Sequence, residues 1–294
     1  MGNLSSNYEN NFTFPTRYEK VNKLCNIKRN SKEYELIIFK SQEYSELQAL
    51  ILYYFAQKYE ELIDVFLPSF FIKDVIDKNK NLSISRRYFQ IIWKCNGKGG
   101  GNLTFPSSNF WDNIIQFKNK STKRFFIISL HFWSCPRQNG GHANLLVYDR
   151  FSNIFERFEP NGLCASNNEW YDSEAFDNEF NEYCEKYDIL YLSPKKLNMP
   201  KKSWQKLQIE QEDDKKTSLN FKSSLEKEEY FLNQGFCSIW CMVFLESKIS
   251  NPDIHPANII EQVSSILDKN KIDYIFFIKY YTINLIIRVC ELLK

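Results

Sequence analysis

Cys237 has the local setting that best suits a nucleophile in this sequence. It follows Gly235 and Phe236 at the predicted start of an apolar helix that runs to Glu246. Unpaired backbone N–H groups and the positive end of the helix dipole stabilise a thiolate at such a position. The same N–H groups can receive the oxyanion of an acyl-transfer intermediate. Cys241, one turn deeper among apolar neighbours, is expected to fill the core.

A predicted β-hairpin supplies a base and an acid for this nucleophile. His142 opens a strand directly after two glycines, and a turn centred on residues 150–151 pairs it with Glu159. Directly opposed residues of antiparallel strands share a face, with Cβ atoms about 5 Å apart. The carboxylate can therefore orient the imidazole and support its protonated form. A slip of one residue in the register undoes this pairing, and Asn161 is the alternative third member.

The surrounding pattern predicts the elements that position these residues. Runs rich in branched and aromatic side chains indicate strands at 124–132, 142–149, 154–159, 189–192 and 204–210. Apolar residues at three- and four-residue steps indicate helices starting near residue 41 and covering 168–187, 235–246, 256–268 and 274–293. The last helix contains Lys279, Asn284 and Arg288, so we expect a buried core helix rather than a membrane span. The fold class is α+β.

Composition excludes several other classes of protein. Of the 294 residues 43% are hydrophobic, so the chain can bury a sizeable core and is not globally disordered. The 38 basic and 36 acidic residues leave a net charge of +2, which does not indicate nucleic acid as a partner. The eight cysteines form no CxxC pair and only three histidines are present, which is not the pattern of a structural metal site.

The beginning of the chain carries a possible lipidation signal. No apolar stretch follows the initiator methionine, so we expect no signal peptide, an intracellular protein that is not secreted, and reduced thiols. Gly2, exposed when the methionine is removed, and Ser6 fit the myristoylation pattern. A single acyl chain would give only weak membrane association.

Three segments together resemble the adenovirus-protease and Ulp1-like group of cysteine proteases, which includes SUMO and ubiquitin-like deconjugating enzymes. They are the stretch 142–149, the stretch 156–162, and Gly-Phe-Cys-Ser-Ile-Trp at 235–240. Their order, His, acid, Gln, Cys, is that of the group, whereas papain itself has its cysteine first. The resemblance covers roughly residues 124–246. The combination of segments also resembles predicted thiol proteases of large DNA viruses. Two positions depart from the group: Ser238 stands where a glycine is usual, and Ala143 where an aromatic residue is usual.

The resemblance implies a fold and a set of site residues. The fold is papain-like, with a small antiparallel sheet packed on the nucleophile helix and extra helices at both ends. Cys237, His142 and Glu159 are the implied nucleophile, base and orienting acid. Gln208, on a strand like the Gln-bearing strand of the viral relatives, is favoured as the oxyanion donor, and Gln234 is the alternative. No metal or cofactor is implied.

The expected organisation and function follow. Residues 1–35 form a flexible arm, 36–95 a helical N-terminal region, and 96–294 the protease domain with a charged insertion at 210–233. The expected activity is cleavage of peptide or isopeptide bonds, with ubiquitin or a ubiquitin-like modifier as the partner, in the host cytoplasm or a virion if the protein is viral. Alternatives are a protease that processes a viral precursor, an acyltransferase of the same fold, and an inactive binding or scaffold protein.

Overall fold

A computed structural model describes residues 44–67, 90–96, 100–133, 141–165, 171–218 and 236–292. These residues form an α+β fold of seven α-helices and one mixed sheet of seven strands. The helices are α3 (Tyr44–Lys58), α5 (Phe110–Lys120), α6 (Ser173–Lys186), α7 (Trp204–Ser218), α9 (Cys237–Ser250), α10 (Pro256–Lys269) and α11 (Tyr274–Leu292). The strands are β1 (Ile63–Val65), β2 (Gln90–Cys95), β3 (Gly101–Thr104), β4 (Phe125–Trp133), β5 (Gly141–Asp149), β6 (Ile154–Phe158) and β7 (Leu190–Leu192).

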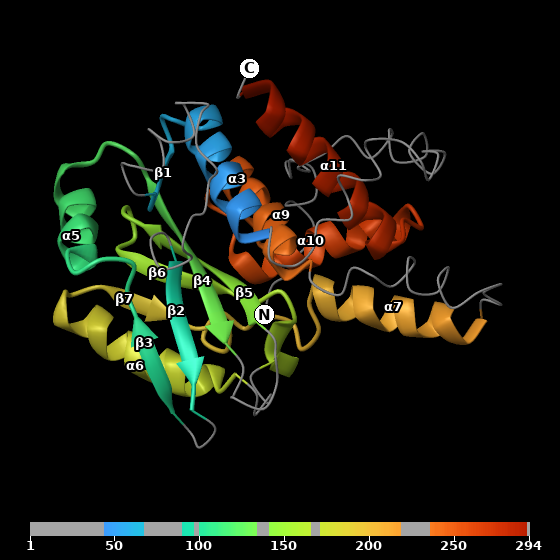
Figure 1. Cartoon of the computed structure of the whole chain (residues 1–294), viewed down its shortest axis with the longest axis horizontal. Coiled ribbons are helices and arrows are strands. Elements are labelled where there is room, and N and C mark those ends of the chain that lie inside the picture. The colour runs from blue at the N-terminus through green and yellow to red at the C-terminus, as the bar shows by residue number, and fades with distance from the viewer. Residues whose placement is uncertain are drawn as a thin grey trace, which may run out of the picture.

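The sheet has the order β3-β2-β4-β5-β6-β7, and β1 pairs with β4 (Figure 1). Its centre, β4-β5-β6, is antiparallel as predicted, whereas β1 and β2 run parallel to β4 and β7 runs parallel to β6. β1 pairs with residues 125–127 of β4 and β2 with residues 129–133, so the two strands follow one another along β4. The prediction of a small, wholly antiparallel sheet was therefore wrong: the sheet has seven strands and is mixed.

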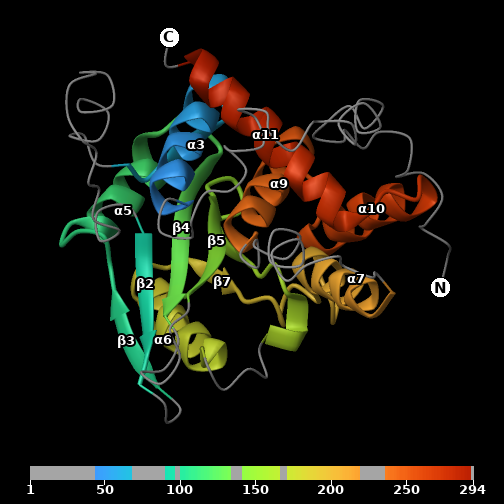
Figure 2. The same ribbon diagram turned by 45° about the vertical axis from the view of Figure 1, so that its right-hand side comes forward.

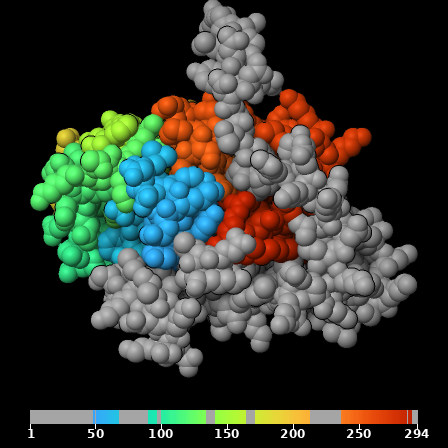
Figure 3. Space-filling model, turned by 90° about the horizontal axis from the view of Figure 1, so that it is seen from above, coloured from blue at the N-terminus to red at the C-terminus, as the bar shows by residue number. Residues whose placement is uncertain are grey.

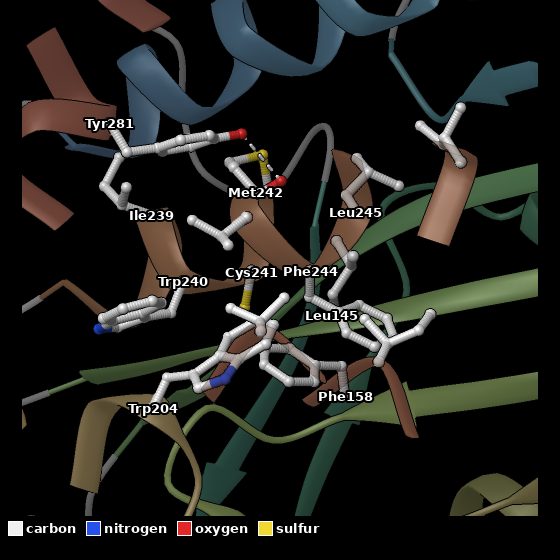
Figure 4. Packing of buried hydrophobic residues seen from close by; sticks show 14 of the residues in the cluster. Leu145, Phe158, Trp204, Ile239, Trp240, Cys241, Met242, Phe244, Leu245 and Tyr281 are labelled. Carbon is white, nitrogen blue, oxygen red and sulfur yellow. Dashed lines mark hydrogen bonds between the residues drawn. The ribbon is translucent and has the colours of Figure 1, made fainter. Parts of the chain in front are cut away.

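The sheet separates two hydrophobic layers, because side chains alternate between its faces. Leu145, Val147 and Phe158 face α9, where Phe158 stacks on Phe244 with ring centroids 4.2 Å apart. Figure 4 shows this contact, and places Trp204 of α7 near Trp240 of α9. The opposite face packs against α5 and α6 (Figure 2) through an aromatic cluster that includes Leu146, Tyr148, Phe155, Phe176 and Phe180.

Helix α9 is the centre of the first layer, since every residue from Cys237 to Ile249 is buried. A helix that is apolar on all sides must be covered on all sides. The sheet covers one side, and α3, α10 and α11 cover the others, with Tyr281 of α11 donating to the Met242 carbonyl. Seen from above, α3 lies beside α11, so segments far apart in sequence meet over α9 (Figure 3).

The segment predicted as a strand at 204–210 is a helix, α7. The expectation of a strand was wrong because Gln, Lys, Leu and Glu dominate the segment, and these residues favour helices. Lys206 and Glu210, one turn apart, support it with an ion pair at 3.8 Å. The first nine residues of the predicted insertion, 210–218, continue this helix, and the rest of it lies outside the described residues.

The described parts of the predicted N-terminal region 36–95 pack with the rest of the described chain. It contributes α3 to the cover of α9, and β1 and β2 to the sheet. The predicted boundary at residue 95 falls inside the β2–β3 pairing, where Cys95 lies opposite Gly101. The predicted arm at 1–35 and the lipidation site at Gly2 lie outside the described residues. Among the helices that the structure describes, none is both long and apolar enough to cross a membrane.

Candidate active site

Cys237 is the first residue of α9, as predicted, and the start of this helix lacks a side-chain cap. Phe236 occupies the N-cap position, and its side chain cannot accept a hydrogen bond from the first turn. By contrast, Asp172 caps α6 and His255 caps α10. The first backbone N–H groups of a helix have no acceptor within the helix. An uncapped start therefore leaves these donors, and the positive end of the dipole, to the cysteine and to whatever binds there.

The β5–β6 hairpin brings Glu159 to His142, although its register is not the predicted one. Leu145 lies opposite Phe158, where the predicted register puts Glu156. The shift is two residues, and an even shift leaves each side chain on its predicted face. Glu159 thus meets His142 as a diagonal neighbour instead of a directly opposed one.

His142 and Glu159 form a close, buried pair. His142 Nε2 lies 2.5 Å from Glu159 Oε1, and the two residues are 4% and 3% exposed. Burial alone would lower the pKa of His142, but the carboxylate charge and hydrogen bonds to Glu159 and Cys237 raise it to about 10. Burial likewise opposes ionisation of Glu159, yet protonated His142, Arg157 and the Asn161 N–H hold its pKa below the usual value. The pair is thus an imidazolium and a carboxylate.

Cys237 completes the cluster through its hydrogen bond to His142. Since Nε2 of the imidazole faces the carboxylate, Nδ1 is the ring nitrogen left for the sulfur. Burial would raise the pKa of the thiol, but the hydrogen bond to His142, the imidazolium charge and the N–H groups of Ala143 and Ser238 outweigh it and lower the pKa. Both shifts favour a thiolate–imidazolium pair, the reactive form of a cysteine.

Ala143 explains how closely helix and strand approach. Its N–H lies 3.4 Å from Cys237 Sγ, and its carbonyl accepts from Cys241 Sγ at 3.6 Å. One residue of β5 therefore contacts the sulfurs of Cys237 and of Cys241, which lies one turn further along α9. Ala143 is buried on the α9 face, where the large side chain usual in the protease group would have to displace the helix.

The structure adds residues that the sequence did not single out. The Tyr171 ring lies over the His142 ring, with centroids 5.5 Å apart, and forms a wall of the site. Burial raises the pKa of Tyr171 to about 12, with help from the charges of Cys237 and Glu159. Behind Glu159, the buried Arg157 forms an ion pair at 2.8 Å with Asp177, which is partly exposed. No spacing rule links residues 157, 171 and 177, because a loop and a helix bring them together.

Asn161, the alternative to Glu159, supports the acid. Its N–H donates to Glu159 Oε1 at 2.9 Å, and its Nδ2 lies 3.5 Å from His142 Nε2.

Gln208, the favoured oxyanion donor, lies on α7 and not on a strand. Its Oε1 accepts from Trp240 Nε1 and its Nε2 donates to Glu212, both at 2.8 Å. Gln208 thus ties α7 to α9 one turn beyond the cysteine, and its role as a donor stays a prediction. Gln234 lies outside the described residues.

The cavities of the described residues lie away from this cluster. Two cavities, of about 680 and 730 Å³, lie along α5, and none of Cys237, His142 or Glu159 lines them. Within the described ranges, no group of three or more His, Cys, Asp or Glu side chains is arranged to hold a metal ion.

Comparison with known proteins gives one distant similarity. Over 202 residues, 59% of the chain, it is 22% identical to the "Putative ankyrin repeat protein L371" of Acanthamoeba polyphaga mimivirus. The match spans a quarter of the length of that protein. No protein-family model matches the chain, and no solved structure does.

Proposed function

We propose that this chain is a cysteine hydrolase that cleaves peptide or isopeptide bonds, with Cys237 as nucleophile, His142 as base and Glu159 as the acid that orients it. One observation carries the proposal. A cysteine at an uncapped helix start is hydrogen-bonded to a buried histidine, which in turn lies 2.5 Å from a buried glutamate. Nucleophile, base and orienting group in hydrogen-bond contact are the signature of covalent catalysis.

The mechanism follows from the charges. The Cys237 thiolate attacks the carbonyl carbon, and the first-turn N–H groups of α9 bind the oxyanion that forms. His142 gives its proton to the leaving amine, which departs and leaves a thioester on Cys237. Neutral His142 then takes a proton from water as the water attacks the thioester. The carboxylic acid product leaves, which restores the Cys237 thiolate and protonated His142. Glu159 keeps the imidazole oriented and stabilises its protonated form throughout.

We infer that the fold is the papain-like fold of the adenovirus-protease and Ulp1-like group. The chain order of base, acid and nucleophile supports this, as does a nucleophile helix packed on the antiparallel β4-β5-β6 core. The similarity to a mimivirus ankyrin repeat protein, at 22% identity over a quarter of that protein, gives no information on the activity of this chain. Ubiquitin or a ubiquitin-like modifier is the proposed substrate class.

A panel of ubiquitin and ubiquitin-like proteins with thiol-reactive C-terminal groups tests this proposal. We expect a covalent adduct with one or more probes, located on Cys237 by peptide mass spectrometry, and no adduct for Cys237→Ala. Cys241→Ala is the matched control, since Cys241 lies on the same helix and burial raises its pKa well above the usual value. This variant should keep the adduct.

Other outcomes separate the alternatives. An adduct that survives Cys237→Ala contradicts the assignment of the nucleophile. A Cys237 that reacts with iodoacetamide at low pH but with none of the probes favours a precursor-processing protease or an acyltransferase. A Cys237 that reacts with neither reagent favours a binding protein and contradicts the proposal.

A further inference from the structure

Arg157 is a buried cation directly behind the candidate acid. It lies two residues before Glu159, and residues two apart on a strand share a face. Arg157 is 1% exposed, and its Nη1 lies 3.6 Å from Glu159 Oε2, the oxygen that does not face His142. The glutamate thus lies between two cations, one on each oxygen.

The guanidinium of Arg157 is held from three sides. Asp177 of α6 accepts from its Nε at 2.9 Å and from its Nη2 at 2.8 Å, which is the two-point geometry that arginine favours. Asn144 of β5 accepts from Nη1 at 2.6 Å. The rings of Phe132 and Phe176 cover it, with centroids 5.4 and 5.7 Å from the guanidinium carbon. A group held this firmly can act as a fixed charge.

The balance of charges shows what this fixed charge does. Cys237, Glu159 and Asp177 supply three negative charges, against the positive charges of His142 and Arg157. Without Arg157, a thiolate and two carboxylates would share one imidazolium. A buried cluster with this excess of negative charge takes up a proton on one of its anionic groups. Glu159, as the more buried carboxylate, is the group that would be protonated. The titratable and charged groups around Glu159 and its two cationic partners, His142 and Arg157, are Tyr171, Asp177, Tyr191, Cys237 and Cys241.

We propose that Arg157 is a positioning residue, which keeps Glu159 ionised so that Glu159 can hold the proton on His142. Arg157 acts through Glu159 and does not touch the nucleophile. Asp177 sets the strength of this effect, because it anchors the guanidinium and also neutralises part of its charge. This inference rests on the proposed function and extends it to two residues for which sequence reasoning assigned no role.

The test uses the rate of alkylation of Cys237 by iodoacetamide as a function of pH, followed by mass spectrometry. The rate follows the thiolate fraction, so its midpoint reports the pKa of the thiol in the folded protein and no substrate is needed. Cys184 and Cys241 serve as internal controls, since both are 0% exposed, whereas Cys237 is 8% exposed, and they react only in molecules that have unfolded.

The two variants have opposite expected effects. Arg157→Gln should move the midpoint upward by about one pH unit, a roughly tenfold slower reaction on the acid side. Asp177→Asn should move it downward, because removing a negative charge leaves Arg157 a stronger partner for Glu159. Arg157→Lys keeps the charge and should restore most of the wild-type midpoint.

A purely structural role gives a different pattern, since both variants damage the same cluster. Midpoints that move upward in both Arg157→Gln and Asp177→Asn, or in neither, overturn the proposal. If Arg157→Gln unfolds, as alkylation of Cys184 and Cys241 would reveal, the direction of the Asp177→Asn shift decides alone. If wild-type Cys237 itself has an ordinary midpoint, the proposed function fails and not only the role of Arg157.

Discussion

Two buried glutamates, Glu159 and Glu246, are held by similar numbers of partners and differ in what those partners can do. Glu246 is 2% exposed, lies on α9, and joins α3 and α11 to it. Its partners are Lys58, Tyr59, Tyr281 and Arg288, at 2.8, 3.2, 2.8 and 3.2 Å. Glu159 is 3% exposed and binds His142, Arg157 and the Asn161 N–H.

The difference lies in the charge of the partners. Glu246 forms ion pairs with a lysine and an arginine, Lys58 and Arg288, and so belongs to a fixed ion cluster that holds helices together. His142 is the partner of Glu159, and a histidine changes its charge during acid–base catalysis. A buried glutamate with fixed partners is therefore a structural device. One with a titratable partner next to a thiol can take part in chemistry.

The largest effect is expected at the titratable pair. Glu159→Gln keeps the size of the side chain and removes its charge, so His142 loses the anion that stabilises its protonated form. Because a positioned acid–base group contributes about 10²–10⁴-fold, we expect hydrolysis of a ubiquitin-like C-terminal amide substrate to slow at least about 100-fold. The alkylation midpoint of Cys237 should also move to higher pH.

Glu156→Gln is the matched control for this variant. Glu156 lies three residues earlier on β6, on the opposite face, where it pairs with Lys248 at 3.2 Å. An equal loss of rate in Glu156→Gln would mean that damage to the strand, rather than loss of the acid, explains the result.

A smaller effect, on stability, is expected at the fixed cluster. Glu246→Gln leaves Lys58 and Arg288 without their carboxylate, but these side chains are 35% and 31% exposed and can turn toward water. We therefore expect the free energy of unfolding to fall by about 2 kcal/mol, less than the 3–5 kcal/mol of a wholly buried pair. Urea unfolding measures the loss. The alkylation midpoint of Cys237 should not change, and a shifted midpoint would end the distinction between the two glutamates.

The smallest effect is the pH dependence of stability that the titratable pair confers. The pKa of His142 is raised from 6.5 to about 10, so its contribution is complete below 6.5 and is lost as the pH rises through 10. The pKa of Glu159 is lowered from 4.5, so its contribution is complete above 4.5 and is lost in acid. The stability difference between wild type and Glu159→Gln should therefore be largest between about pH 4.5 and 6.5. A difference that grows from neutral to alkaline pH would contradict this sign.

The contact between His142 and Glu159 could be predicted from the sequence, because it depends only on the alternation of side chains between the two faces of a strand. The hairpin turn has four residues, 150–153, so the register differs by two residues from that of the predicted turn centred on residues 150–151. In this turn Asn153 has a positive φ of 58°, and its Oδ1 accepts a hydrogen bond from Tyr148. The contact between Glu159 and His142 survived because two residues is one full strand period.

Other parts of the structure had no local signal. Gln208 was placed on a strand because the segment resembled one, whereas its own residues favour a helix. The parallel pairing of β1 and β2 with β4 depends on contacts between distant segments, as do the positions of Arg157 and Tyr171. Sequence periodicity reports which face a residue takes, but not which distant element covers that face.

The burial of α9 on all sides has a consequence for the order in which the protein matures. The hairpin that carries His142 and Glu159 is synthesised well before α10 and α11, which provide much of the cover of α9. Since chains fold as they leave the ribosome and an apolar helix stays unstable until it is packed, the nucleophile is set in place only after the last helix has emerged. We therefore expect a chain still in synthesis to lack the proposed catalytic cluster.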